Sequence, residues 1–158
     1  MTAKIIKTET KINDILFWLC ALITFLTIAM TLLEFFSRGE YPSPNISLFY
    51  IGVLAIYSLH KEAIRFLEHA IPERTRKPKR GELFVYLWII LTGILYTINF
   101  LSKNHYSYSD LGEPTPGLMT ATYITLEVGI VFILARILKL LMINYFYKPL
   151  EKNNEQQG

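Results

Sequence analysis

One acidic side chain lies deep inside an apolar stretch of this sequence. Glu127 is the ninth residue after Leu118, where a stretch begins that has no basic residue before Arg136. At a helical rise of about 1.5 Å per residue, Glu127 would lie about 13 Å from that start, close to the middle of a membrane. Carboxyl groups at such a depth are rare and suggest a function by default. Two hypotheses remain open: a proton or cation site, or a protonated glutamate that donates one hydrogen bond inside a helix bundle.

Four hydroxyl-bearing residues are the predicted hydrogen-bond partners of Glu127. Tyr123 precedes it by four residues, which is about one turn of the same helix, and the others lie at a similar depth in other apolar stretches. Arg136 follows Glu127 by nine residues, about 13 Å along a helix, which is too far for a direct ion pair. The four predicted partners are Thr27, Thr92, Tyr96 and Tyr123.

Polar residues recur at helical spacing in every apolar stretch. The first stretch has Cys20, Thr24, Thr27, Thr31 and Glu34, which are spaced 4, 3, 4 and 3 and therefore share one helix face. Similar series in the other stretches are Ser47, Tyr50 and Tyr57; Thr92, Tyr96, Asn99 and Lys103; and Thr120, Tyr123 and Glu127.

These polar series allow two interpretations. Polar side chains at helix interfaces in membranes form packing contacts worth about 0.6 kcal/mol each. Alternatively, they line a polar cavity that opens to the non-cytoplasmic side. The mouth of such a cavity would be acidic, with Glu34, Glu40, Asp110 and Glu113. For Glu34 itself, its position at the end of a stretch predicts a solvated carboxylate at the membrane boundary.

A second series in the last stretch consists of small residues. Ala121, Thr125 and Gly129 recur every four residues, a spacing that lets helix backbones approach closely. At about 100° per residue, Thr125 lies roughly 160° around the helix from Glu127. The small residues therefore form a packing surface, either for a neighbouring helix of the same bundle or for a second copy of the chain.

The composition indicates the kind of element that positions these residues. Hydrophobic residues make up 52% of the 158 residues and charged residues only 18%. A soluble domain this small could not bury so much apolar surface. The single cysteine, Cys20, excludes a disulfide scaffold, and the 14% of aromatic residues excludes a disordered chain. The remaining class is an all-α integral membrane protein.

The predicted fold is a bundle of four transmembrane helices in one domain, residues 1–150. A transmembrane helix needs about 20 apolar residues, and the second stretch is shorter, so it either crosses and continues as an amphipathic helix to residue 71 or re-enters the same side. Of the 16 basic residues, 14 lie in 1–14, 60–82 and 136–158 and only two in the opposite loops. This bias predicts that both termini are cytoplasmic and that the second stretch crosses. The predicted spans are 15–36, 46–59, 83–102 and 118–147.

Two features at the ends of the spans predict contacts with lipid. Trp18, Tyr86 and Trp88 toward one end, and Tyr50 and Tyr106 toward the other, are the expected interfacial anchors. In the middle loop, basic residues are dense and should attract anionic lipid headgroups by about 1 kcal/mol each. These basic residues are Arg74, Arg76, Lys77, Lys79 and Arg80. Because no aromatic residue lies between them, nucleic acid is not an expected partner. Residues 151–158 form a polar tail.

No catalytic motif, metal-ligand spacing or cofactor signature accompanies these features. His60 and His69 are nine residues apart, whereas helical metal pairs need three or four. The leading hypothesis is therefore a non-enzymatic protein of the cytoplasmic (inner) membrane that assembles with itself or with other membrane proteins. The alternative is a small proton- or cation-coupled transporter or channel that uses Glu127.

Overall fold

The computed structural model describes residues 2–43, 46–69 and 82–142 of the chain. In these residues it contains four α-helices and no strand, which confirms the all-α prediction. A short 3-10 helix, η1, follows the third α-helix. The elements are α1 (Thr2–Phe36), α2 (Ile46–His69), α3 (Glu82–Leu101), η1 (His105–Ser107) and α4 (Gly117–Met142).

Each helix coincides with one of the predicted apolar stretches, but α1 and α2 extend beyond the apolar part. α1 begins at Thr2 and contains neither glycine nor proline over its 35 residues. α2 continues without a break past residue 59 to His69, so the second apolar stretch and the amphipathic segment after it form one helix. Its 24 residues correspond to about 36 Å.

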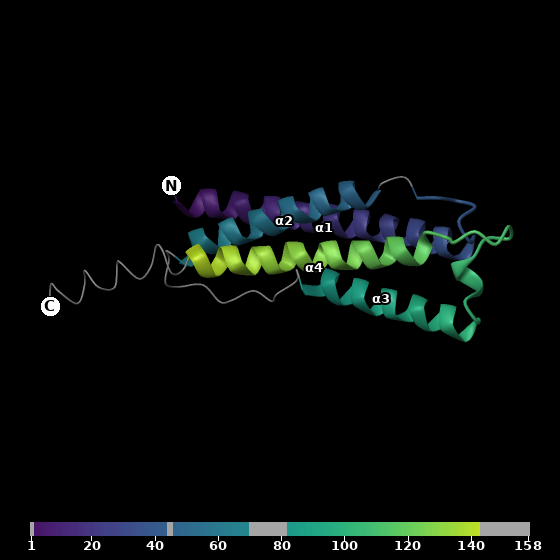
Figure 1. Ribbon diagram of the computed structural model, residues 1–158. Helices are drawn as coiled ribbons and strands as arrows, with labels where there is room; N and C mark the ends of the chain where they lie inside the picture. Colours follow the sequence, from purple (N-terminus) through teal and green to yellow (C-terminus); the bar gives the residue numbers. More distant parts are fainter. Residues whose placement is uncertain (1, 44–45, 70–81, 143–158) are drawn as a thin grey trace.

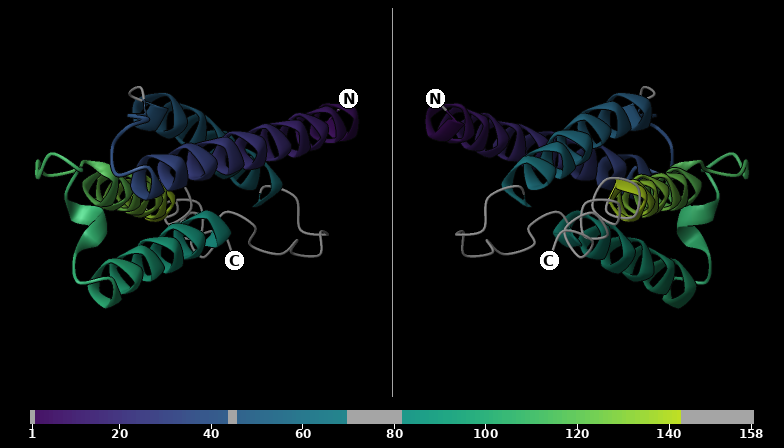
Figure 2. Two further views of the ribbon diagram at one scale, coloured as in Figure 1. Left: turned by 90° about the vertical axis from the view of Figure 1, so that its right-hand side faces the viewer. Right: turned by 90° about the vertical axis from the view of Figure 1, so that its left-hand side faces the viewer.

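The helices are arranged side by side, with α4 near the centre (Figures 1 and 2). α1 packs on α2, α2 packs on α4, and α4 packs on α3, while α1 also contacts α4. α3 therefore lies at the edge of the bundle, on the far side of α4 from α1 and α2. It reaches α2 through a few long side chains near its first turns, including Trp88.

The turn after α1 and the loop after α3 meet at one end of the bundle, which we call the loop end (Figure 1). α1 ends where Arg38 and Gly39 adopt positive φ angles of 56° and 86°. Arg38 Nε donates to the Tyr108 carbonyl at 2.7 Å, and the Arg38 guanidinium pairs with Asp110. A cation thus ties the two connections together although they are about 70 residues apart in sequence.

Gly117, the first residue of α4, lies directly against the backbone of α1. A Cβ atom at this position would lie 2.8 Å from Phe35 Cα and 3.0 Å from Phe35 N. These atoms belong to a helix backbone and cannot rotate away. The absence of a side chain at Gly117 is therefore what allows α4 to start in contact with the end of α1.

Two of the helices are long and apolar enough to cross a membrane. They are α1 over Lys11–Phe36 and α3 over Glu82–Leu101. Only 22% and 28% of their most apolar windows are buried inside the protein. Most of their apolar side chains therefore lie on the outside of the bundle.

Candidate functional site

The polar series of α1 faces the inside of the bundle. Cys20, Thr24, Thr27, Thr31 and Glu34 are all buried. The three threonine hydroxyls donate to carbonyls one turn back in the same helix, at 2.7, 2.8 and 2.9 Å. Because these hydroxyl protons are used within α1, the threonines satisfy themselves and pack as small neutral side chains.

A buried hydrogen-bonded group links α1, α2 and α3. Trp88 Nε1 donates to the Tyr50 hydroxyl at 2.9 Å, and this hydroxyl lies 3.3 Å from Thr24 Oγ1. Thr24 has one proton and gives it to the Cys20 carbonyl, so Tyr50 supplies the proton of the 3.3 Å contact. The order Trp88 to Tyr50 to Thr24 satisfies every donor, and we call these three residues the core polar triad.

The core polar triad corrects part of the prediction for aromatic anchors. Trp88 and Tyr50 are fully buried and cannot lie at the membrane interface. Trp18 and Tyr86, in contrast, are exposed. Residue type and approximate depth could not separate the two kinds, because an indole or phenol with a buried partner has the same sequence signature as one that faces headgroups.

The small residues of α4 pack mainly against α3. Ala121 is fully buried, and the Thr125 hydroxyl lies 2.7 Å from the Thr92 hydroxyl of α3. Gly129 is different, because a Cβ atom there would meet nothing within 4 Å. Two members of the predicted packing surface therefore contact a neighbouring helix of the same chain, and Gly129 leaves open space.

Asn99 of α3 is buried beneath the loop end. Its Nδ2 donates to Ser107 Oγ at 2.8 Å and lies 3.3 Å from Asn104 Oδ1. These bonds hold η1 against the end of α3. The Asn99 Oδ1 atom is buried and has no partner among the described residues.

Glu34 differs from its prediction as a solvated boundary carboxylate. The residue is only 2% exposed, and its Oε2 accepts a hydrogen bond from the Ser43 hydroxyl at 2.8 Å. The start of α4 covers it, since Gly117 packs on the backbone of Glu34 and Phe35. The prediction was wrong because the end of the apolar stretch is covered by another segment of the chain.

Glu127 lies on the flank of α4, partly buried, about 100° around the helix from the buried residue Val128. Its Oε2 atom is buried and has no hydrogen-bond partner in the part of the chain that the structure describes. The predicted partners bond elsewhere: Thr27 to its own helix, Thr92 to Thr125 and Tyr96 to Thr122. The pairing of Glu127 with these residues is therefore not formed.

Two of the predicted partners line a surface pocket at the loop end instead. Tyr96 and Tyr123 are half-exposed and contribute to its wall, but Glu127 does not. The predicted acidic mouth does not form either, because Glu34 is buried and Asp110 pairs with Arg38. No carboxylate lines this pocket among the residues described.

The remaining predictions fall partly outside the described residues. The basic residues Arg74, Arg76, Lys77, Lys79 and Arg80, the end of the last predicted span and the polar tail all lie there. Within the described residues, no group of three or more His, Cys, Asp or Glu side chains is placed to hold a metal ion.

Comparison with known proteins adds no relative. No family model matches this chain, and no match to it is found among curated proteins or among solved structures. The class supported by the fold is a helical protein with two helices able to cross a membrane.

Proposed function

We propose that this chain is an integral protein of the cytoplasmic (inner) membrane, with four spans and both termini in the cytoplasm. The apolar exterior of α1 and α3 is the observation that carries this proposal. Trp18 is 72% exposed on α1 and Phe100 is 77% exposed on α3, among many other large apolar side chains. Such surface is stable in lipid but not in water.

The two remaining helices suit the same orientation. α2 and α4 correspond to about 36 and 39 Å, more than the roughly 30 Å of a hydrocarbon core. The loop end carries only Arg38 and Lys103 as basic residues, and Arg38 is neutralised by Asp110. Four crossings with the loop end outside agree with the positive charge of the other segments.

Cysteine labelling tests this orientation. The native Cys20 is buried and should stay unlabelled, which gives a silent background. In intact spheroplasts, a membrane-impermeant maleimide should label Glu113→Cys at the exposed loop end. It should label Thr8→Cys only after permeabilisation. Labelling of both positions from the same side, or the reverse pattern, would contradict the proposed topology.

For its role, we propose that the chain is a non-enzymatic assembly subunit that associates with itself or with other membrane proteins. The support is that α3 has one helix neighbour along most of its length, which leaves a broad apolar face beside α4. Gly129 adds a position with open space at backbone level. Small residues of this kind let a second helix approach closely.

The alternative role, a proton- or cation-coupled transporter or channel, is favoured by one observation on Glu127. Its buried Oε2 has no partner in the described residues, and a buried polar atom without a partner is costly. A transported proton or cation would provide that partner. The pocket at the loop end ends at Tyr123, one turn before Glu127, so the static structure contains no lined path to it among the described residues.

One reconstitution experiment separates the two roles. The protein is labelled with a fluorophore, diluted into liposomes, and analysed for subunit number by single-molecule photobleaching. Proton flux is measured in the same liposomes. Assembly predicts multi-step bleaching at dilutions where a monomer control shows one step, with equal flux from wild type and Glu127→Gln. Single-step bleaching, with flux that is lost in Glu127→Gln but kept in the surface control Glu113→Gln, would replace the assembly proposal with the transporter.

A further inference from the structure

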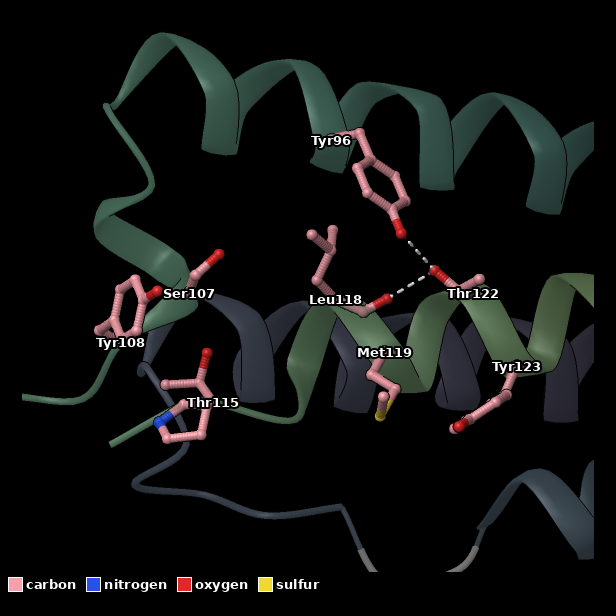
Figure 3. Close-up of a pocket in the computed structure, with 9 residues that line it drawn as sticks. Tyr96, Ser107, Tyr108, Thr115, Leu118, Met119, Thr122 and Tyr123 are labelled. Atoms are coloured by element: carbon pink, nitrogen blue, oxygen red, sulfur yellow. Dashed lines mark hydrogen bonds between the residues drawn. The ribbon is translucent and has the colours of Figure 1, made fainter. Parts of the chain in front are cut away.

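The pocket at the loop end has a volume of about 380 Å³ and lies between α3, the loop after η1 and the first turns of α4 (Figure 3). Small-molecule sites span about 300–1,000 Å³, so the pocket suits a group of modest size. Its wall includes six hydroxyl-bearing side chains and no charged one. The six are Tyr96, Ser107, Tyr108, Thr115, Thr122 and Tyr123.

Three of these hydroxyls are already used as donors. Thr122 donates to the Leu118 carbonyl at 2.8 Å, so the Tyr96 hydroxyl donates to Thr122 across 3.1 Å (Figure 3). Thr115 donates to the Tyr106 carbonyl at 2.5 Å. Each oxygen keeps a lone pair, so Tyr96, Thr115 and Thr122 can still accept hydrogen bonds from a ligand.

The other three hydroxyls can donate. Ser107 Oγ accepts from Asn99 Nδ2 at 2.8 Å, and its own proton goes to no acceptor in the described residues. The hydroxyls of Tyr108 and Tyr123 likewise make no hydrogen bond within that part of the chain, and both side chains are half-exposed. The pocket therefore offers donors and acceptors in similar number, from fixed positions on three elements.

Leu118, Met119 and the tyrosine rings supply apolar walls between these hydroxyls. The combination selects a ligand with several hydroxyl groups, apolar C–H faces and no charge. A phosphate group would find no cation, and a quaternary ammonium group would leave the hydroxyls unused. We infer that this pocket binds a neutral sugar ring, carried either by a glycolipid headgroup or by a free saccharide.

The test uses the full chain in phosphatidylglycerol nanodiscs, after exchange from any glycosidic detergent. Methyl β-glucoside is the free probe, monitored by saturation-transfer NMR. Nanodiscs that contain monoglucosyl diacylglycerol provide the lipid probe, monitored by native mass spectrometry. Binding of the lipid probe alone would assign the sugar to a glycolipid, and binding of both would assign it to the saccharide itself.

Variants connect binding to this pocket. Ser107→Ala and Tyr123→Phe should each weaken binding about three- to tenfold, the usual effect of one lost hydrogen bond. Met119→Trp should abolish binding, because the exposed Met119 side chain leaves room for an indole that fills the pocket. Tyr41→Phe, an exposed tyrosine of the loop end outside the lining, should bind as wild type.

Three results would overturn the inference: no binding of either probe, binding unchanged in all three pocket variants, or displacement of the glucoside by phosphocholine. A circular dichroism spectrum and melting midpoint like those of wild type show that each variant is folded. The readout does not depend on the number of subunits, on flux or on which side of the membrane is labelled. Failure of the sugar inference is therefore distinguishable from failure of the proposed function.

Discussion

Replacing Gly117 with alanine should destabilise the protein by about 1–3 kcal/mol, the usual cost of overpacking a close contact. The new Cβ would lie 2.8 Å from Phe35 Cα, inside van der Waals contact with a backbone that is fixed in α1. Either the start of α4 must move away or the end of α1 must shift. Both movements would also loosen the cover over the buried Glu34 carboxyl group.

Gly129→Ala is the matched control, because it adds the same methyl group to the same helix where nothing lies within 4 Å. In a helix interior this change should stabilise by about 0.5–1 kcal/mol, since glycine is a poor helix former. Reversible unfolding in mixed micelles measures both changes. Equal stability of the two alanine variants would show that α4 does not start against α1. A destabilised Gly129→Ala variant would instead indicate that a second chain occupies the space beside it.

Tyr50→Phe should destabilise by about 1–3 kcal/mol although it removes a single oxygen atom, because it leaves a buried donor without an acceptor. Trp88 Nε1 loses its 2.9 Å bond and is fully buried, so water cannot replace the phenol. Thr24 keeps its bond to the Cys20 carbonyl. The loss therefore falls on the indole and on the link between α2 and α3.

A double-mutant cycle isolates this effect from the loss of packing. Trp88→Phe alone is costly because it removes a large buried ring, but Tyr50→Phe should add little once the indole donor is absent. We expect a coupling energy of about 1–2 kcal/mol from the same unfolding measurement. Tyr86→Phe, which changes an exposed tyrosine at the first turns of α3, should stay within about 0.5 kcal/mol of wild type. Additive effects of the Tyr50 and Trp88 changes would contradict the core polar triad.

The polar series of α1 shows how far a periodic pattern can predict structure. The spacing of Cys20, Thr24, Thr27, Thr31 and Glu34 indicated one helix face, and the structure buries all five residues. The pattern was reliable because α1 is a single unbroken helix and polar groups avoid its apolar faces. The same method was less successful for α4, where Tyr123 is half-exposed and lines a pocket beside α3. A helix with neighbours on two sides has more than one inner face, and spacing alone cannot say which residues meet which neighbour.

The sequence by itself determined the helical class, the approximate bounds of the four helices and the inward face of α1, since these depend on local apolarity and on residue spacing. Tertiary structure alone decided which polar groups have partners. It placed Trp88 on Tyr50, covered Glu34 with the start of α4, paired Arg38 with Asp110 and left Glu127 Oε2 without a partner in the described residues. Each of these outcomes depends on which helix lies beside which, and on the close approach that Gly117 permits. Such contacts join residues far apart in the chain, so no local pattern in the sequence contains them.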